Sequence, residues 1–171
     1  ITGSVVIKDS DNVVKVNLLN YIKNMIVGYD IYTHKDITNI PGKSFLIVNE
    51  QNIIQDIIEK QIVSNIICLG VYCFEDISIF IKAYEELKQQ NISGEMYISH
   101  VISYMLTKYK LVFEAVQASY YEDWGTLDEW RKVQQNFRTY FVDIDGILLR
   151  NRGKYGRINW HNNDGIIPEN M

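Results

Sequence analysis

Residues 65–74, NIICLGVYCF, form an almost unbroken run of apolar side chains within this 171-residue chain. A run of this length and composition is typical of a strand that is buried on both of its faces. Such a strand lies inside a sheet and has other elements packed over it. The run therefore predicts the central strand of a buried sheet.

The segments on either side of this run predict further strands and helices. The residues NEQN at 49–52 separate two apolar runs and predict a hairpin. The order of strands and helices predicts an α/β fold, with a mixed sheet covered by helices. The expected strands are residues 3–8, 25–34, 44–60 as the hairpin, 65–74, 111–121 and 139–149, and the expected helices are residues 76–90, 95–109 and 127–136.

The first two of these helices each have one apolar face, which should pack on the sheet. Asp76 is the expected N-cap of the first helix. Its inward side chains are expected to be Ile77, Phe80, Ile81, Tyr84 and Leu87. In the second helix they are expected to be Ile98, Val101, Ile102 and Met105.

Composition argues against several classes of protein. The formal net charge of -4 and the pI near 5.4 disfavour a nucleic-acid-binding surface, which is normally basic. No apolar run is long enough to cross a bilayer, and no signal peptide opens the chain, so no membrane insertion is expected. Cys68 and Cys73 would face opposite sides of one strand, which predicts two free thiols in a reducing cytoplasm. The three histidines are scattered, so a zinc site is not expected.

Two acidic turns follow predicted strands. The first is Asp9-Ser-Asp-Asn at residues 9–12, and the second is Glu122-Asp-Trp-Gly-Thr at residues 122–126. Ligands of open α/β sheets bind beyond the carboxyl ends of strands, so both turns could meet in one cleft. Carboxylates that converge there suit Mg²⁺, which binds one or two of them together with phosphate oxygens. The alternative is that the acidic residues only stabilise turns and helix caps.

Several stretches resemble, in the right order, the central and C-terminal parts of the sugar-phosphate nucleotidylyltransferase family. They are DSDN at 9–12, DIIEK at 56–60, SNIICLGVYCF at 64–74, SGEMYISHVISYML at 93–106 and YYEDWGT at 120–126. The resemblance covers about residues 1–130. It implies a Rossmann-like fold of the GT-A-like type. It also implies an enzyme that joins a nucleoside triphosphate to a sugar phosphate, or to a similar small phosphate, and releases pyrophosphate.

The resemblance implies roles for the acidic turns. Asp11 in the Asp-Asn pair and Asp123 in the Asp-x-Gly-Thr turn match the two Mg²⁺ ligands of the family, and Asp9 is a weaker candidate beside them. Both substrates are anionic, so a cation held by Asp11 and Asp123 would neutralise the α-phosphate and orient an in-line displacement. No protein nucleophile is required, because positioning and electrostatics carry the rate.

Four further positions match substrate-binding residues of the family. Glu59 and Lys60 match a Glu-Lys pair whose glutamate holds sugar hydroxyls. Gly70 stands where the backbone of the family runs close to the sugar, and Glu95 matches an acidic position near the rim of the active site. The alternatives are structural: a solvated strand end for Glu59 and Lys60, a close-packing glycine for Gly70, and a favourable helix-dipole position for Glu95.

One part of the family pattern is missing. The family binds nucleotide on a Gly-rich loop with an Arg and a Lys, and nothing before Asp9 matches that loop. We expect the loop to lie upstream of Ile1, so that the fold is incomplete at the N-terminus here. By analogy, the product would serve surface polysaccharide (capsule or lipopolysaccharide) synthesis. The 12 tyrosines are compatible with a homo-oligomer, although tyrosine more often lies in cores and on strand faces.

The segment FVDIDGILLRNRG, residues 141–153, resembles the first motif of haloacid-dehalogenase-like (HAD-like) phosphatases. That resemblance implies Asp143 as the nucleophile and Asp145 as the general acid/base, with Mg²⁺ completing the site. Ile147 departs mildly from the family, and the alternative is that Asp-Gly only ends a strand in a turn. The expected domains are a nucleotidyltransferase-like domain at 1–137 and the beginning of a phosphatase-like domain at 138–171.

Two other functions remain open from the sequence. The first is a phosphatase in which Asp143 carries the function and residues 1–137 are a scaffold. The second is a degenerate nucleotidyltransferase-like domain that only binds ligands or partners. Whether the Asp143-Ile-Asp-Gly stretch is a phosphatase motif or only a turn, we expect the segment 138–171 alone not to hydrolyse phosphate esters.

Overall fold

The computed structural model describes residues 2–18, 23–33, 37, 39–90 and 94–137. The chain divides into two units, Ile1–Trp130 and Arg131–Met171. The fold described below is that of the first, together with the helix at residues 127–136, which begins in the first unit and ends in the second. The strand expected at 139–149, with Asp143 and Asp145, lies outside the described residues. The domain limits of 1–137 and 138–171 therefore stay a prediction.

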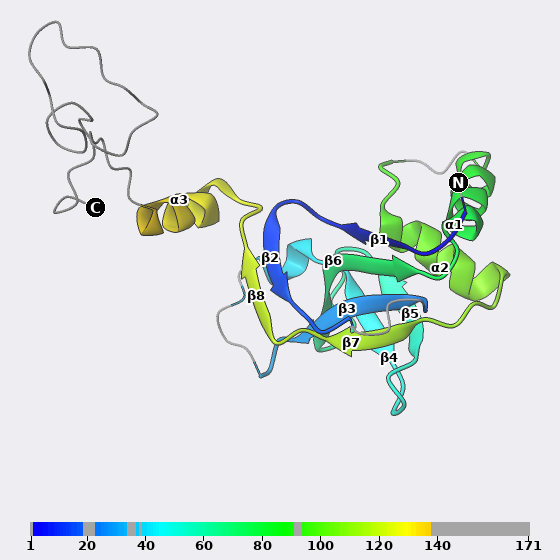
Figure 1. The fold of residues 1–171 in the computed structure, drawn as a ribbon, viewed down its shortest axis with the longest axis horizontal. Helices are drawn as coiled ribbons and strands as arrows, with labels where there is room; N and C mark the ends of the chain where they lie inside the picture. The colour runs from blue at the N-terminus through cyan, green and yellow to red at the C-terminus, as the bar shows by residue number, and fades with distance from the viewer. Residues whose placement is uncertain (1, 19–22, 34–36, 38, 91–93, 138–171) are drawn as a thin grey trace, which may run out of the picture. The chain divides into compact units, whose positions relative to one another are not determined.

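The first unit is built on a six-stranded mixed sheet (Figure 1). Its strands are β1 (Val5–Lys8), β3 (Met25–Asp30), β4 (Phe45–Val48), β5 (Ile54–Ile58), β6 (Ile66–Phe74) and β7 (Glu114–Gln117). The apolar run predicted as the central strand is β6, which pairs antiparallel with β1, β3 and β4. β7 pairs parallel with β3, which makes the sheet mixed. The predicted α/β fold with a mixed, helix-flanked sheet is confirmed.

The predicted hairpin is formed by β4 and β5, which pair antiparallel. Its turn is held by Asn49, whose Oδ1 accepts hydrogen bonds from the N–H groups of Gln51 (3.0 Å) and Ile53 (2.9 Å). Asn52 has a φ of 59°, a left-handed conformation that asparagine tolerates better than most residues. The sequence NEQN therefore turns the chain because Asn49 supplies a side-chain acceptor for two backbone N–H groups and Asn52 adopts the left-handed conformation.

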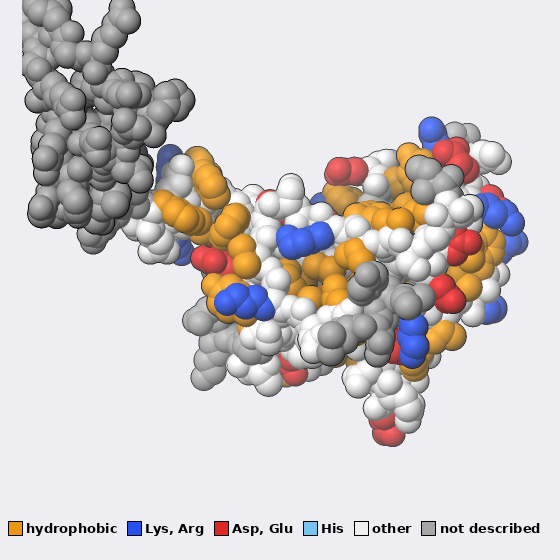
Figure 2. Space-filling model, in the orientation of Figure 1, with side chains coloured by type: hydrophobic (Ala, Val, Ile, Leu, Met, Phe, Trp, Pro, Cys, Tyr) orange, Lys and Arg blue, Asp and Glu red, His pale blue; other side chains and the backbone are white. Residues whose placement is uncertain are grey.

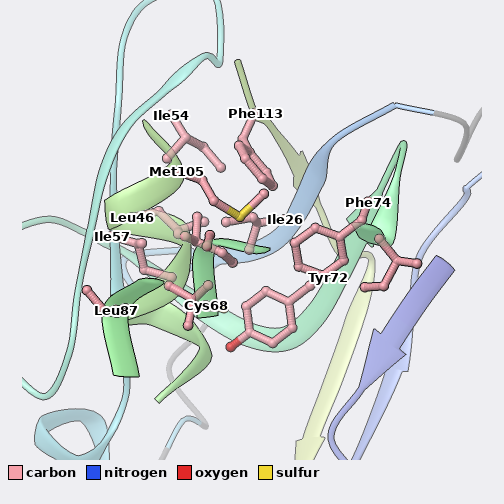
Figure 3. Packing of buried hydrophobic residues seen from close by; sticks show 14 residues of the cluster. Ile26, Leu46, Ile54, Ile57, Cys68, Tyr72, Phe74, Leu87, Met105 and Phe113 are labelled. Carbon is pink, nitrogen blue, oxygen red and sulfur yellow. The ribbon is translucent and has the colours of Figure 1, made fainter. Parts of the chain in front are cut away.

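Helices α1 (Ile77–Lys88) and α2 (Ile98–Lys108) lie together against one face of the sheet (Figure 1). Asp76 caps α1 as predicted, because its carboxylate accepts a hydrogen bond of 2.9 Å from the N–H of Ser78. The main core lies between these helices and the sheet (Figure 3). It includes Ile26, Leu46, Cys68, Tyr72, Phe74 and Phe113.

The inward face of α1 differs from the prediction. Ile81 and Tyr84 are 39% and 36% exposed, whereas Ala83 is fully buried. The small side chain of Ala83 forms the contact, and the two larger side chains lie beside it at the rim. In α2 the prediction is right, since Val101, Ile102 and Met105 are buried and Ile98 packs partly against the core.

The other face of the sheet is covered by a two-stranded antiparallel ribbon, β2 (Asn12–Lys15) and β8 (Tyr120–Asp123). Its side chains Val14 and Tyr121 pack on a second apolar cluster of the sheet. Residues 111–121, expected as one strand, are therefore two strands. The reason is a change of partner: Ala118 N–H still bonds to Gly28 of β3 (3.0 Å), whereas Ser119 N–H bonds to Lys15 of β2 (2.8 Å).

The last helix, α3 (Leu127–Asn136), has the bounds expected from the sequence. It begins with a reciprocal cap in which Glu129 Oε2 accepts from Thr126 Oγ1 at 2.8 Å and Glu129 N–H donates to Thr126 Oγ1 at 3.2 Å. None of the helices in the described part of the chain is long and apolar enough to cross a membrane. On the face shown in Figure 2, acidic and basic side chains are interspersed.

The centre of β6 offers a test of the fold. Ile67 is fully buried, so Ile67→Val should lower the free energy of unfolding by about 0.5–1.5 kcal/mol, because one methylene leaves a packed site. The same substitution at Ile62, which is 58% exposed, should have almost no effect. Urea unfolding followed by circular dichroism measures both. Equal effects would contradict the burial of β6.

Candidate functional site

A cleft of about 500 Å³ opens where the β2–β8 ribbon meets the sheet and the start of α2. It is the place where both acidic turns and most of the predicted substrate-binding residues come together. The lining segments contribute Asp9, Asp11, Asn12, Asn39, Gly42, Lys43, Ser44, Glu59, Lys60, Cys68, Leu69, Gly70, Tyr72, Met96, Tyr97, Ile98, Ser99, Tyr121, Asp123, Gly125 and Thr126. All of these segments belong to the first unit of the chain.

The two acidic turns meet at one end of this cleft. Antiparallel pairing of β2 with β8 sets Asn12 opposite Asp123, and Trp124 N–H donates to the Asp11 carbonyl at 2.8 Å. Gly125 lies between the two carboxylates. The point where a Cβ atom on Gly125 would stand is 3.0 Å from Asp11 Oδ2 and 3.1 Å from Asp123 Oδ1. The turns thus converge as predicted, but through antiparallel pairing rather than because neighbouring strands end at one edge.

The residue after Asp11 fixes the first turn. Asn12 is buried, and its Nδ2 donates to the Leu69 carbonyl of β6 at 3.2 Å. Its Oδ1 accepts from Lys8 Nζ at 2.8 Å, and the same ammonium donates to the Asp9 carbonyl at 2.6 Å. The Asp-Asn pair therefore has a structural reason: the asparagine anchors the turn that presents Asp11.

Lys43 is a residue of the site that the sequence analysis missed. It follows the short 3₁₀ helix η1 (Ile40–Gly42), and its Nζ forms an ion pair with Asp123 Oδ2 and donates to Tyr121 Oη at 2.8 Å. The side chains of Lys43 and Asp123 are only 17% and 9% exposed. No motif marks this lysine, because its partner lies far away in the sequence.

These contacts keep Asp123 ionised. Burial favours the neutral form, but the hydrogen bonds from Lys43 and from Gly125 N–H (2.9 Å) outweigh it, so the pKa of Asp123 lies below its usual value. Burial and the nearby Asp123 carboxylate raise the pKa of Tyr121, so its hydroxyl stays protonated. The end of the cleft therefore holds fixed negative charge on Asp123 and one matching ammonium group.

Asp9 packs directly on Gly70. Asp9 N–H donates to the Gly70 carbonyl at 2.8 Å, and Gly70 has a φ of +67°. A Cβ atom on Gly70 would lie 1.9 Å from Asp9 Oδ2, so only glycine fits at this position. Burial and the neighbouring Asp11 carboxylate raise the pKa of Asp9. Asp9 and Gly70 both line the cleft, and the space above the glycine is taken by the aspartate.

Glu59 lies on the cleft wall and is held by two serines that the sequence did not single out. Its Oε2 accepts hydrogen bonds from Ser44 Oγ at 2.6 Å and from Ser99 Oγ at 2.5 Å. Ser99 is 1% exposed, so this contact fixes the carboxylate against α2. Both hydroxyls use the same oxygen, and within the described residues no side chain or backbone donor bonds to Oε1.

Lys60 and Glu95 meet through Tyr97. Lys60 Nζ bonds to the Tyr97 hydroxyl and lies 4.1 Å from the ring centroid, and that hydroxyl donates to Glu95 Oε2 at 2.5 Å. Lys60 and Tyr97 line the cleft. Of the predicted site residues that the structure describes, Glu95 alone lies outside the lining. Its link to the cleft is the hydrogen bond that it accepts from Tyr97.

The donor set at the ribbon end fits a divalent cation that shares its coordination with a substrate. Within the described ranges, no group of three or more His, Cys, Asp or Glu side chains could hold a metal ion by itself. The oxygens of Asp11 and Asp123 that face the space above Gly125 nevertheless match Mg²⁺, which commonly takes one or two carboxylates and completes its shell with phosphate oxygens and water.

The cysteines are free and buried, as predicted. Burial raises the pKa of Cys68 to about 11 and also raises that of Cys73. At pH 8 both should therefore stay protonated, and the native protein should not react with Ellman's reagent over minutes. Two thiols per chain should react in denaturant. Rapid reaction of a thiol in the native state would contradict the burial.

Comparisons with known proteins support the fold but not a close relationship. No family model matches the chain, and no curated protein matches it in sequence. Among solved structures, it is similar to the nucleoside-diphosphate-sugar pyrophosphorylase from Vibrio cholerae RC9, with a TM-score of 0.62 and 16% identity, over 79% of this chain and 57% of that one.

Two cytidylyl-transferring enzymes are also similar in structure. The CTP:phosphocholine cytidylyltransferase from Streptococcus pneumoniae has a TM-score of 0.56 at 14% identity, over 77% of this chain and 56% of that chain. The inositol-1-phosphate CTP transferase from T. maritima has a TM-score of 0.53 at 13% identity, over 74% and 51%. The chain thus spans little more than half the length of these proteins, and it has the fold of the corresponding part of a nucleotidyltransferase.

Proposed function

We propose that this protein is a Mg²⁺-dependent nucleotidyltransferase that joins a nucleoside triphosphate to a sugar phosphate, or to a similar small phosphate, and releases pyrophosphate. The observation that carries the proposal is the convergence of Asp11 and Asp123 on one point of the cleft. These carboxylates come from turns more than a hundred residues apart in the sequence. Their meeting on a nucleotidyltransferase fold supports a shared phosphate and metal site.

The charges of the cleft suit this reaction. An oxygen of the acceptor phosphate attacks the α-phosphorus of the triphosphate, the bond from that phosphorus to the bridging oxygen breaks, and pyrophosphate leaves with its electron pair. When bound, Mg²⁺ would supply positive charge to the reacting phosphate oxygens. Asp11 and Asp123 would hold it, and Lys43 would add an ammonium group at the same end of the cleft. Positioning and charge would carry the rate.

Pyrophosphate release tests the proposal. The full-length protein should release pyrophosphate from a nucleoside triphosphate only when a sugar phosphate or similar phosphate is also present, and EDTA should stop the reaction. A panel of the four triphosphates against several sugar phosphates and phospho-alcohols would cover the substrate class. Pyrophosphate release that does not depend on an acceptor would count against the proposal. The absence of pyrophosphate release with every pair of triphosphate and acceptor would also count against it.

Glu59 is the residue proposed to orient the acceptor. Serine hydroxyls hold Oε2, and Oε1 can accept a hydrogen bond from a hydroxyl of the acceptor. Hydrogen bonds to charged groups contribute about 1.5–3 kcal/mol, so Glu59→Gln should raise the KM of the acceptor about tenfold or more and leave the KM of the triphosphate unchanged. Glu85→Gln, exposed on α1 and outside the lining, is the matched control and should change both constants little. Equal changes in both KM values would remove this role from Glu59.

Other parts of the hypothesis rest on the sequence alone. A role in surface polysaccharide synthesis, a cytoplasmic location and a phosphatase-like segment with Asp143 and Asp145 stay predictions. The phosphatase alternative predicts Mg²⁺-dependent hydrolysis that disappears in Asp143→Asn. The binding-domain alternative predicts that Asp11→Asn and Asp123→Asn change no activity at all.

A further inference from the structure

We propose that Lys43 competes with a divalent cation for Asp123, and that it exchanges this carboxylate for a substrate phosphate when cation and phosphate bind together. The proposal deepens the proposed function and rests on it, because it takes Asp123 as a ligand of the cation. It makes Lys43 a positioning residue that couples two binding events at one end of the cleft.

Both oxygens of Asp123 are engaged in the structure. Gly125 N–H donates to Oδ1 at 2.9 Å, and Lys43 Nζ is paired with Oδ2. A cation that binds Asp123 must therefore share or replace one of these partners. The backbone N–H of Gly125 belongs to the same turn as Asp123 and cannot leave without rebuilding it. The ammonium of Lys43 is the partner that can leave, because it is carried by a long side chain.

The backbone of Lys43 is held by hydrogen bonds, while its side chain borders the cleft. Lys43 N–H donates to the Ile40 carbonyl at 3.1 Å, and its carbonyl accepts from Lys60 N–H at 3.1 Å. The side chain lines the cleft together with Asp11 and Asp123. An ammonium group that leaves Asp123 therefore stays in the same cavity, where a phosphate oxygen can replace the lost carboxylate.

This arrangement predicts coupling between cation and phosphate. Without phosphate, a cation on Asp123 either shares the carboxylate with the ammonium of Lys43 at close range, where the like charges repel, or breaks a pair whose side chains are largely buried, and both weaken its binding. With phosphate, Lys43 gains a new charged partner, so that cost falls. Thermodynamic linkage requires the effect to be mutual: cation binding strengthens phosphate binding by the same factor. The cleft would thus favour the cation in its substrate-bound form over the free ion.

Direct Mn²⁺ binding, measured by the EPR signal of free Mn²⁺, tests the competition without an activity assay. Lys43→Met keeps the length of the side chain but removes the charge, and it should tighten Mn²⁺ binding about tenfold. Lys43→Arg keeps the charge and should stay near wild type. Lys60→Met is the matched control, since it removes another lysine of the same cleft that pairs with Tyr97 instead of Asp123.

Three outcomes would overturn the inference. Equal tightening in Lys43→Met and Lys60→Met would show only a general charge effect. Unchanged or weaker binding in Lys43→Met would show that Lys43 does not compete. Absence of Mn²⁺ binding in every variant would contradict the metal site of the proposed function as well, whereas the first two outcomes leave that site intact.

Chemical labelling of lysines gives a second test. If Lys43 had only a structural role, its labelling would not change when ligands are added. Acetylation of the native protein by a water-soluble reagent, followed by mass spectrometry, reports how accessible each amino group is. Labelling of Lys43 should rise when Mn²⁺ is added and fall again when inorganic pyrophosphate is added with Mn²⁺. Labelling of Lys23, which pairs with Glu114 and does not line the cleft, should stay constant. Constant labelling of Lys43 under all conditions would contradict the exchange.

Discussion

Asp123→Asn should reduce pyrophosphate release at least about 100-fold, while substrate KM values change much less. The substitution keeps the shape of the side chain and removes one negative charge from a position that faces Asp11 above Gly125. Removing a single group that stabilises charge in a transition state commonly costs about 100- to 1,000-fold in rate. The substitution also removes the carboxylate that pairs with Lys43 in a largely buried place. The ammonium group of Lys43 would then have to find another partner.

Glu122→Gln is the matched control for this substitution. Glu122 is the neighbour of Asp123 in β8, carries the same charge, and hydrogen-bonds to Tyr120 outside the cleft lining. Steady-state pyrophosphate release in the full-length protein should be close to wild type in this control. Circular dichroism should show that both variants are folded. A turnover of Asp123→Asn close to that of Glu122→Gln would remove Asp123 from the reaction.

Gly70→Ala should destabilise the protein by about 2–5 kcal/mol. The left-handed φ of +67° alone costs a non-glycine residue about 1–2 kcal/mol. The added Cβ would lie 1.9 Å from Asp9 Oδ2 and 2.4 Å from Asp9 Cγ, so the aspartate has to move, and overpacking of this kind costs about 1–3 kcal/mol. Because both residues line the cleft, activity should fall with stability.

Two further variants separate the strain from the overlap. Gly94→Ala places the same side chain at a φ of +103° with nothing within 4 Å of the new Cβ, so it should show only the backbone cost. Asp9→Ala combined with Gly70→Ala removes the carboxylate that the new methyl group would meet. The double variant should be destabilised by less than the sum of the single effects. Simple additivity in urea unfolding would show that Asp9 does not pack on Gly70.

Local sequence signals were sufficient for most of the sheet and its helices. The apolar run of β6, the asparagine-rich turn after β4 and the cap at Asp76 each act over a few residues, so their patterns survive in the sequence. The face of α1 was harder to predict, because helical spacing alone does not say that Ala83 makes the close contact. Which side chain of α1 makes the close contact depends on the surface packed against the helix, and that surface is formed only by the tertiary fold.

The ribbon and the lysine of the site could not be predicted from local patterns. β2 and β8 are four residues each, and their pairing joins Asn12 to Asp123 across the whole first unit. Lys43 is one of many lysines in the sequence, and only the fold sets it beside Asp123. Ser44 and Ser99 likewise could not be recognised as site residues from the sequence, because only the fold brings both hydroxyls to Glu59. Asp11 and Asp123 were predicted only through the family resemblance, because the motifs of a family include residues that lie far apart in sequence and meet in the fold.

The fate of a labelled phosphate tests the central claim most directly. The full-length protein would be incubated with Mg²⁺, a nucleoside triphosphate and a sugar phosphate labelled with ³²P, and the products would be separated by chromatography. Nucleotidyl transfer predicts that the label appears in a nucleoside diphosphate sugar, formed in step with pyrophosphate. Label released as inorganic phosphate would instead favour a phosphatase, and label that stays in the sugar phosphate, across the substrate panel, would contradict a transferase.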